Sequence, residues 1–324
     1  MLASVIIPAY NAQTTIARCL TALRQQTLPP EEYEIIVVDD ASTDGTVEIA
    51  REHGAAVIVQ TVRSGPAAAR NAGAAQAQGD VLLFIDADCE AAPDWCTEML
   101  RPFADPTVCG VYGAYRTRQT SLAARFAQAE FEERYARLIQ RQDIDFIATH
   151  AAAIRRDVFL AQGGFRLDMW GNEDVELAFR LSRSGYRLVF APHAIVYHEH
   201  PSTLRRYLQA KVSRGYWRTL AYARHPPKAL SDAYTPPWLK LQVVGLVALA
   251  IAMVAGALRP SFLPFALSLL AALLLTTVPF VRFVWRTQPG LLWIAPWLSL
   301  ARSAALALGV CAGLIAVAIH LLRR

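Results

Sequence analysis

The sequence has little cysteine, and no two of its cysteines lie close enough together to form a ligand pair. The five cysteines are Cys19, Cys89, Cys96, Cys109 and Cys311, and no Cys-x-x-Cys pair occurs. A disulfide framework or a zinc-binding framework is therefore not expected, and reduced thiols are the default state. The chemistry of this chain must come from other side chains.

Acidic residues are almost missing from the last third of the chain. Residues 201–324 hold one acidic residue and 14 Lys and Arg, whereas residues 1–200 hold 26 acidic and 18 basic residues. The basic residues flank apolar stretches and do not cluster with aromatic side chains, so no nucleic-acid partner is expected. We interpret these basic residues as facing lipid and as setting the orientation of the chain in a membrane.

The first residues lack the features of a secretory signal. Residues 1–8 carry no cationic segment, and their apolar run is too short for a signal peptide. The first domain is therefore expected to stay in the cytosol.

Short apolar runs alternate with helical stretches up to about residue 115. The runs that predict strands cover residues 4–8, 35–39, 55–60, 81–85 and 108–112, and helix-compatible stretches cover residues 14–25, 46–52, 66–78 and 93–103. This alternation predicts an α/β fold with a mostly parallel sheet and helices on both faces. Ligands of such sheets bind beyond the carboxyl ends of the strands.

The following residues complete a first domain over 1–200 and begin a basic segment over 201–237. Helices are expected over 121–142, 154–164 and 174–184, and strands over 187–190 and 195–197. Within 204–222, apolar residues recur every four positions, and between them lie Arg205, Arg206, Lys211, Arg214 and Arg218. This pattern predicts an amphipathic helix at a membrane surface, and a solvated helix packed on the domain is the alternative.

Residues 238–324 predict a membrane domain of about three helices. Apolar stretches cover residues 239–258, 261–281 and 303–322, and each is long enough to cross a bilayer. Residues 291–300 contain Trp293, Pro296 and Trp297, which suggests a segment that lies at the interface. Buried helices of a soluble protein are the alternative for any one stretch, but three in series favour insertion.

The distribution of charge predicts the orientation in the membrane. The basic residues that precede the first apolar stretch place that side in the cytoplasm, as the positive-inside rule requires. The protein is thus expected to be a multi-pass protein of the inner membrane with a cytoplasmic first domain. A third span would leave Arg323 and Arg324 outside, so a re-entrant last segment is its rival.

Two carboxylates follow the apolar run at 81–85. Asp86 and Asp88 are two residues apart, so both side chains can converge on one cation. Carboxylate oxygens suit Mg²⁺ or Mn²⁺, and such an ion would neutralise a diphosphate. The alternative is a pair of solvated acids in a turn.

Several stretches in order resemble the family 2 glycosyltransferases of the GT-A fold. They are SVIIPAYN at 4–11, VVDDASTDGT at 37–46, GPAAARNAG at 65–73, FIDAD at 84–88, GGF at 163–165 and GNED at 171–174. The resemblance covers roughly residues 3–215, and the motifs occur in the order that the family has.

This resemblance implies a site for a nucleotide-sugar donor. Tyr10 would contact the nucleobase, Asp40 would hydrogen-bond a base edge with Asp39 nearby, and Arg70 would lie beside the nucleotide. Asp88 would ligate the metal, and Asp86 would contact the ribose, the metal or both. The resemblance also makes Pro8, Arg155 and Glu173 part of the substrate-binding group. Each of these residues has an ordinary structural alternative, such as a turn, a cap or a surface ion pair.

Asp174 and His198 take roles in catalysis and metal binding by the same resemblance. Asp174 matches the residue that takes the proton from the acceptor hydroxyl in inverting members, and general-base chemistry needs such a group. His198 matches a histidine that some members place on the metal or the diphosphate. The alternatives are an acid favoured by the dipole of a helix start for Asp174, and a structural role for His198.

The sequence departs from the family at two places. Ala41 stands where Gly is commoner, and the QxxRW motif of processive synthases is absent, because residues 213–217 read SRGYW. Processive polymerisation is therefore not expected.

The expected function is inverting transfer of one sugar from a UDP-, GDP- or dTDP-sugar, with Mg²⁺ or Mn²⁺, to a lipid-associated hydroxyl in cell-envelope glycan or glycolipid synthesis. A polyprenyl-phosphate glycosyltransferase is the alternative enzyme. A non-catalytic membrane module that senses nucleotides is the alternative from another class. A nucleotidyltransferase would carry a Gly-rich loop where this chain has residues 8–11.

Overall fold

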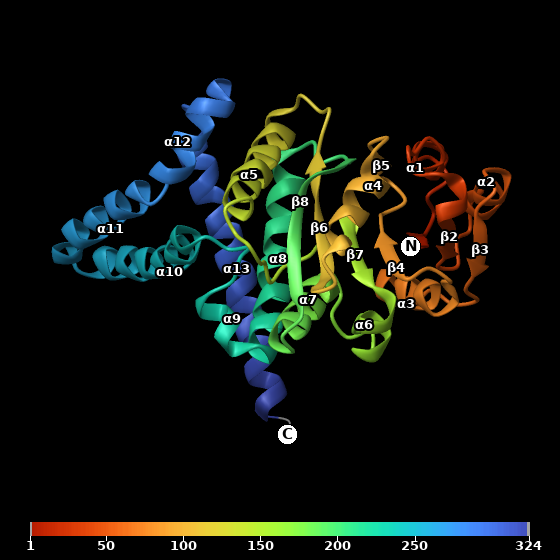
Figure 1. The fold of residues 1–324 in the computed structure, drawn as a ribbon. Coiled ribbons are helices and arrows are strands. Elements are labelled where there is room, and N and C mark those ends of the chain that lie inside the picture. The colour runs from red at the N-terminus through yellow and green to blue at the C-terminus, as the bar shows by residue number, and fades with distance from the viewer. Residues whose placement is uncertain (1, 323–324) are drawn as a thin grey trace. The chain divides into compact units, whose positions relative to one another are not determined.

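The computed structural model describes residues 2–322, with side chains for residues 2–319. The chain forms two compact units. The first comprises the residues up to Arg118 together with Tyr135–Glu199, and the second comprises Gln119–Arg134 and the residues from His200 onward. Figure 1 gives the labels of the elements.

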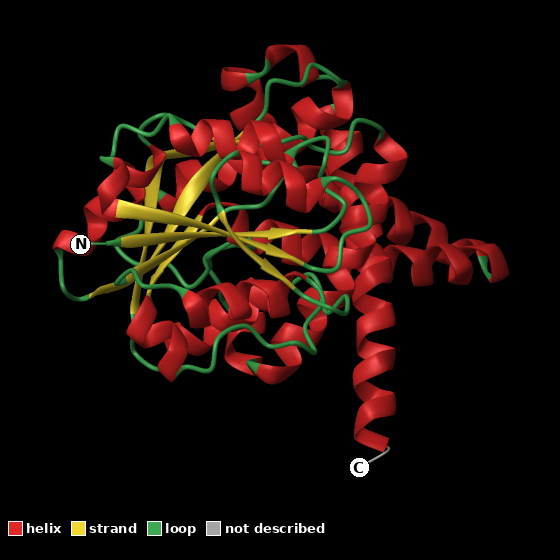
Figure 2. Cartoon of the chain, turned by 90° about the vertical axis from the view of Figure 1, so that its right-hand side faces the viewer, coloured by secondary structure: helices red, strands yellow, loops and turns green. Residues whose placement is uncertain are grey.

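An eight-stranded mixed sheet forms the centre of the first unit, and its strands are drawn in yellow in Figure 2. Its order is β3-β2-β1-β4-β7-β6-β8-β5. The four strands from β3 to β4 are parallel, β7 is antiparallel to both neighbours, β6 and β8 are parallel, and β5 is antiparallel to β8. The strands are β1 (Ala3–Ala9), β2 (Tyr33–Asp39), β3 (Ala56–Val59), β4 (Val81–Phe84), β5 (Glu90–Ala91), β6 (Val108–Arg116), β7 (Ala152–Arg155) and β8 (Arg187–Tyr197).

Helices cover both faces of the sheet because its strands are apolar on both faces. The helices are α1 (Ile16–Arg24), α2 (Thr46–Glu52), α3 (Pro66–Gln76), α4 (Trp95–Leu100), α6 (Arg156–Ala161) and α7 (Glu173–Arg183). Helix α5 (Leu122–Leu138) belongs to the second unit as far as Arg134. Val5 and Ile7 of β1 share a buried core with α1, whereas Ile6 points toward α3. A Cβ on Gly73 of α3 would lie 2.6 Å from Ile6, so glycine permits this close approach.

The α/β fold expected from the sequence is confirmed, with two corrections. The helix expected over 154–164 is wrong at its start, because residues 152–155 form β7 and α6 follows. The two strands expected over 187–190 and 195–197 are one continuous strand, β8. Both errors concern pairing between distant segments, which overrides the local helix preference of the alanines before residue 154.

The second unit is helical. Its helices are α8 (Leu204–Arg224), α9 (Pro226–Leu230), α10 (Pro237–Leu258), α11 (Leu263–Leu275), α12 (Val278–Thr287) and α13 (Ala295–Leu322). Three stretches are long and apolar enough to cross a membrane, namely Pro237–Leu258, Pro260–Thr287 and Ala295–Ile319. Residues 295–300 are the first turns of α13, and the interfacial position expected for residues 291–300 stays a prediction. Arg323 and Arg324 lie outside the described residues.

Glycines bring α8 and α13 together along their length. A Cβ on Gly215 of α8 would lie 2.5 Å from the carbonyl oxygen of Leu306, and one on Gly313 would lie 2.7 Å from Thr219. Gly309 lies against the carbonyl oxygen of Val212 with no room for a Cβ. Small residues four apart on one helix allow this kind of backbone contact between membrane helices.

Bulk at Gly309 is expected to separate the two helices. Gly309→Leu should lower the free energy of unfolding by roughly 2 kcal/mol or more, because an overpacked contact forces the backbones apart. Thermal unfolding of the full chain in detergent measures this. Ala312→Leu is the matched control, since Ala312 is exposed on the same helix. Equal unfolding temperatures for the two variants would contradict the close packing.

Candidate functional site

Several of the candidate residues of the first unit follow the carboxyl ends of parallel strands. In the register of β1 with β2, Ala9 lies opposite Asp39, and in that of β1 with β4, Ile6 lies opposite Phe84. Tyr10 follows β1, Asp40 follows β2, and the two carboxylates at 86 and 88 follow β4. One edge of the sheet therefore gathers these groups, as its topology requires.

The two neighbouring aspartates after β2 have different partners. Asp40 accepts hydrogen bonds from the amides of Ser64 (2.6 Å) and Gly65 (2.8 Å), so it holds the loop that leads into α3. Asp39 Oδ2 accepts from the amide of Ser42 at 3.0 Å. Asp39 Oδ1 is buried and has no hydrogen-bond partner among the described residues. A buried acceptor of this kind is suited to a donor supplied by a ligand.

Ala41 has a backbone conformation that favours glycine. Its φ is +60°, which explains why glycine is the commoner residue here in the family that the sequence resembles. Ala41→Gly is expected to raise the free energy of unfolding by roughly 0.5–1 kcal/mol, because relief of the left-handed strain exceeds the added entropy of the unfolded chain. Thermal unfolding checks this, with Ala74→Gly within α3 as a control expected to destabilise. A loss of stability in Ala41→Gly would contradict it.

The Tyr10 ring is partly open and is covered by a cation. Tyr10 is 39% exposed, and the guanidinium carbon of Arg63 lies 3.9 Å from the ring centroid. Arg63 was not predicted from the sequence, and only its place in the loop after β3 could have pointed to it. An aromatic face and a cation side by side can hold a base and a phosphate.

Arg70 joins two motifs that are far apart in the chain. Its Nη2 lies 2.6 Å from Asp86 Oδ1, and its Nη1 lies 2.7 Å from Glu173 Oε1. The Arg70 side chain is 4% exposed, and burial opposes its charge, but the two carboxylates keep the pKa of Arg70 raised. This bridge fixes the start of α7 beside the turn after β4.

Asp174 is held next to that bridge. It is the second residue of α7, directly after Glu173. Its Oδ1 accepts a hydrogen bond from the amide of Val175 at 2.7 Å. Its Oδ2 accepts from the amide of Thr149 at 3.3 Å, which is a long hydrogen bond. The carboxylate is therefore oriented by the backbone and is half-buried.

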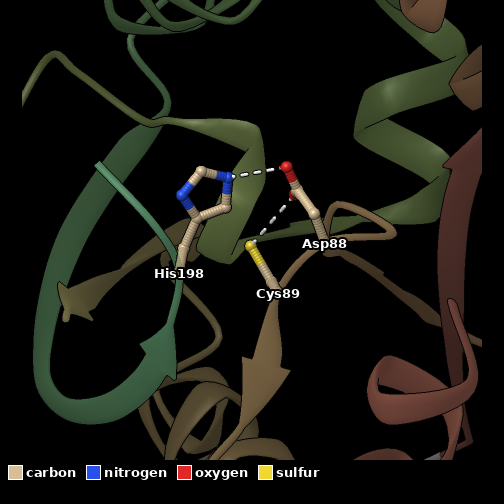
Figure 3. A group of neighbouring side chains, drawn as sticks. All are labelled: Asp88, Cys89 and His198. Carbon is tan, nitrogen blue, oxygen red and sulfur yellow. Dashed lines mark hydrogen bonds and ion pairs between the residues drawn. The ribbon is translucent and has the colours of Figure 1, made fainter. Parts of the chain in front are cut away.

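Asp88 and His198 form a pair at the start of the loop after β4 and at the end of β8, as Figure 3 shows. His198 Nε2 lies 2.9 Å from Asp88 Oδ2, and its Nδ1 lies 2.6 Å from the hydroxyl of Tyr115. Burial opposes both charges, yet the contact lowers the pKa of Asp88 and raises that of His198. The hydroxyl of Tyr115 fixes the orientation of the imidazole ring.

These two groups fit a divalent cation. Two ligands at right angles on an octahedral Mg²⁺ or Mn²⁺, each at about 2.1 Å, lie about 3 Å apart. The separation of 2.9 Å between Asp88 Oδ2 and His198 Nε2 agrees with this. Asp88 is more than half exposed, so water and a diphosphate can complete the shell. Bound there, a cation would neutralise the charge that develops on a diphosphate leaving group.

Cys89 is the third member of this cluster but is poorly suited as a ligand. Its ligand atom lies within 4.8 Å of those of Asp88 and His198, and Figure 3 shows it beside them. Burial raises the pKa of the Cys89 thiol well above its usual range. A protonated thiol is a weak ligand for a hard cation.

Two residues expected in the site, Arg155 and Pro8, are not among the side chains gathered after the carboxyl ends of the strands. Arg155 lies opposite Val81 at the beginning of β4, and its guanidinium donates to the carbonyl oxygens of Val108 and Phe103. The structure therefore does not bring Arg155 to the carboxyl edge of the sheet. Pro8 lies within β1 opposite Val38, where its ring shapes the end of the strand.

Tyr115 was missed by the sequence analysis. It lies in β6, opposite Val196 of β8. Tyr115 reaches His198 only because these two strands pair. No local pattern around residue 115 signals this contact. Only the strand pairing could have found it.

Comparison with known proteins agrees with this geometry. Residues 4–161 match the family model described as glycosyl transferase family 2. These residues form a glycosyl transferase family 2 domain. The matched residues contain β1, β2, the turn after β4 and Arg70, which are the parts of the site described above. The expectation of a family 2 glycosyltransferase fold is confirmed.

Two curated relatives and one solved structure show how far the similarity extends. Glycosyltransferase AglE of Haloferax volcanii is 33% identical over 208 residues, which is 60% of this chain and 66% of AglE. The pre-mycofactocin glycosyltransferase of Mycobacterium tuberculosis is 30% identical over 271 residues, 78% of this chain and 55% of the relative. The chain thus spans between about half and two thirds of the length of these two relatives.

The solved structure covers nearly all of the chain. It is a mannosyltransferase of Pyrobaculum calidifontis in complex with GDP-Man and Mn²⁺, with a TM-score of 0.64 and 25% identity over 96% of this chain and 86% of that one. The glycosyl transferase family 2 domain therefore has the GT-A fold with apolar helices after it.

Proposed function

We propose that this glycosyl transferase family 2 protein transfers one sugar from a nucleotide-diphosphate sugar to the hydroxyl of a lipid-associated acceptor, with inversion at the anomeric carbon. The acceptor belongs to cell-envelope glycan or glycolipid synthesis. The bridge that Arg70 makes to Asp86 and Glu173 carries this proposal, because it joins the turn that would hold the donor to the helix start that would supply the base.

The donor would occupy the carboxyl edge of the sheet. Tyr10 would contact the nucleobase, and Asp39, whose Oδ1 has no partner among the described residues, would accept a hydrogen bond from the base edge. Asp40 would act through the loop that it holds at Ser64 and Gly65. This assignment moves the base contact from Asp40 to Asp39, since both oxygens of Asp40 already accept from amides.

The metal would be held by Asp88 and His198, with Asp86 beside them. The relative solved with GDP-Man and Mn²⁺ supports a divalent cation and a nucleotide-diphosphate sugar for this chain too. Because Asp86 Oδ1 is paired with Arg70, only its second oxygen would be available to the cation or to the ribose.

Asp174 would take the proton of the acceptor hydroxyl. The new bond forms between the acceptor oxygen and the anomeric carbon, and the bond from that carbon to the diphosphate breaks. The proton passes to the Asp174 carboxylate, and the nucleoside diphosphate leaves with the bonding electrons. A hydroxyl requires such a base, whereas an ionised phosphate acceptor does not.

The apolar helices would place the acceptor and the enzyme in the same membrane. Three stretches are long and apolar enough to cross a bilayer, which supports membrane association. We assign the protein to the inner membrane as a multi-pass protein with its first unit in the cytoplasm, where nucleotide sugars are made. The basic residues before the first stretch support this orientation.

Label transfer into lipid tests the proposal. The full chain is reconstituted in vesicles with a bacterial lipid extract and given radiolabelled UDP-, GDP- and dTDP-sugars with Mn²⁺. We expect one donor to label the organic phase with a product that resists mild acid. A product that mild acid hydrolyses would indicate a sugar phosphate and the polyprenyl-phosphate alternative. Label that stays in water with every donor would contradict a lipid acceptor.

A further inference from the structure

A cavity in the second unit is lined by an excess of positive charge. Its volume is about 530 Å³, and six cationic side chains line it, from α5, α8, α10 and α13. They are Arg134, Lys211, Arg214, Arg218, Lys240 and Arg302. None of them has a part in the glycosyl-transfer site described above.

The carboxylates near this cavity do not balance that charge. Glu130 lies in the wall and pairs with Lys211 Nζ at 2.8 Å and with Arg302 Nη1 at 2.9 Å. Asp232 pairs with Lys240 Nζ at 3.0 Å. Of the described residues that line the cavity, Glu130 is the one carboxylate and six are cations.

Arg134 has buried hydrogen-bond donors that no described residue accepts. It is 7% exposed, and its Nε and Nη1 have no hydrogen-bond partner among the described residues. Its guanidinium carbon lies 3.6 Å from the Tyr234 ring centroid, and that of Arg218 lies 4.4 Å from the same ring. Buried guanidinium donors without acceptors are costly, and an acceptor supplied by a bound anion would lower this cost.

The rest of the cavity wall is apolar. Val243 and Val244 of α10 and Leu306, Val310 and Leu314 of α13 line it. Val244 and Leu314 are 68% and 57% exposed, although both lie in stretches apolar enough to cross a membrane. A charged end joined to an apolar wall fits an amphiphile better than a free ion.

The pKa of Tyr234 reflects the positive charge at the end of the cavity where the cationic side chains lie. Burial by itself would raise the pKa of Tyr234, but Arg134, Arg214, Arg218 and Lys211 lower it to about 7. Arg134 comes from α5, where Glu130 also lies, and the other three come from α8. These cations therefore make the charged end of the cavity favourable for a negative charge.

We propose that this cavity binds a membrane lipid by its phosphate headgroup, with the hydrocarbon chain along α10 and α13. The phosphate oxygens would accept from Arg134 and Arg218, because guanidinium and phosphate pair in a charge-assisted, bidentate manner. Basic pockets among membrane helices recognise anionic headgroups in this way. This inference goes beyond the proposed function and does not depend on it, since no sugar transfer is involved.

Direct binding separates a lipid from a free ion. The full chain in detergent is stripped of lipid and titrated with dioleoyl phosphatidic acid, dioleoylglycerol or inorganic phosphate, and complexes are counted by native mass spectrometry. We expect phosphatidic acid to bind at least roughly ten-fold more tightly than dioleoylglycerol, which lacks the phosphate, or inorganic phosphate, which lacks the lipid chains. Equal binding of dioleoylglycerol would overturn the headgroup assignment. Equal binding of inorganic phosphate would overturn the lipid assignment.

A pair of matched variants locates the site. Arg134→Gln should weaken the binding of phosphatidic acid by roughly ten-fold or more, which is the usual worth of a charged hydrogen bond. Arg205→Gln is the control, because Arg205 is exposed on α8 and does not line the cavity. An equal loss in both variants, or no loss in Arg134→Gln, would overturn the site.

The ionisation of Tyr234 provides a second test, made on the native chain, which does not depend on the folding of the Arg134→Gln variant. Tyrosinate absorbance is titrated against pH, and Tyr234→Phe supplies the baseline. Without lipid, one tyrosine should ionise near pH 7. Phosphatidic acid should move this midpoint upward by at least about one pH unit, since a bound anion opposes the phenolate. An unchanged midpoint at saturating lipid would overturn the proposal.

Discussion

Asp88→Ala is expected to abolish metal-dependent nucleotide binding and to lower turnover by roughly 10²-fold or more. Asp88 Oδ2 and His198 Nε2 lie 2.9 Å apart and form the pair that fits a divalent cation. Without the carboxylate, only His198 and the second oxygen of Asp86 would remain to hold the cation, and the diphosphate would lose its counter-ion. Calorimetry with a nucleoside diphosphate, with and without Mn²⁺, measures the loss.

The neighbouring thiol provides the control for this experiment. Cys89→Ala removes the third group of the cluster in Figure 3, yet it should leave the affinity for Mn²⁺ unchanged because the thiol is protonated. If Asp88→Ala bound the nucleotide as the native chain does, or if Cys89→Ala lost the metal response, the ligand assignment would be wrong.

Asp174→Asn should separate chemistry from binding. The amide is isosteric with the carboxylate and can still accept from Val175, but it cannot take a proton. Turnover is therefore expected to fall by roughly 10²-fold or more, which is the usual contribution of a positioned general base. The affinity for the nucleoside diphosphate should stay near that of the native chain. Initial rates and calorimetry on the same preparation give both quantities.

Glu173→Gln is the matched comparison one residue earlier. Glu173 is buried and pairs with Arg70 at 2.7 Å, so this change weakens the bridge and leaves the base in place. We expect a lower unfolding temperature and weaker nucleotide binding, with a smaller loss of turnover at saturating donor than in Asp174→Asn. Full activity of Asp174→Asn would refute its role as base, or would indicate a phosphate acceptor.

The parallel half of the fold could be read from the sequence because its signals are local. Apolar runs such as 35–39 and 81–85 are short and continuous, and helical stretches lie between them. The residues that follow these strands must then share one edge of the sheet, which is where Asp39, Asp40 and Asp86 lie. Here the topology of the backbone decides the position of the site.

The antiparallel part of the sheet could not be read in this way. β7 has the sequence Ala-Ala-Ile-Arg, which has no strand preference of its own, and it is a strand because it pairs with β4 and β6. The error at the start of the helix expected over 154–164 follows from this. Pairing between segments some 40 to 70 residues apart leaves no local signature.

The contacts that organise the candidate site are also non-local. The family resemblance placed Arg70 beside a nucleotide, but its bridge to Glu173 joins residues 103 positions apart.

The regular spacing of Lys211 and Arg218 with apolar residues predicts a surface helix. The structure instead buries both side chains, because glycines let α8 pack directly on α13. Periodicity gives the helix and its faces, but not the partner that covers each face.

Cleavage of the donor in the absence of any acceptor tests whether this site activates a nucleotide sugar through a divalent cation. The purified full chain is incubated with UDP-, GDP- and dTDP-sugars, either with Mn²⁺ or with a chelator, and the released nucleoside diphosphate is measured. We expect slow cleavage of at least one nucleotide sugar with Mn²⁺, none with the chelator, and none by Asp88→Ala. Cleavage that is equal with and without metal, or no cleavage of any donor by the native chain, would contradict it.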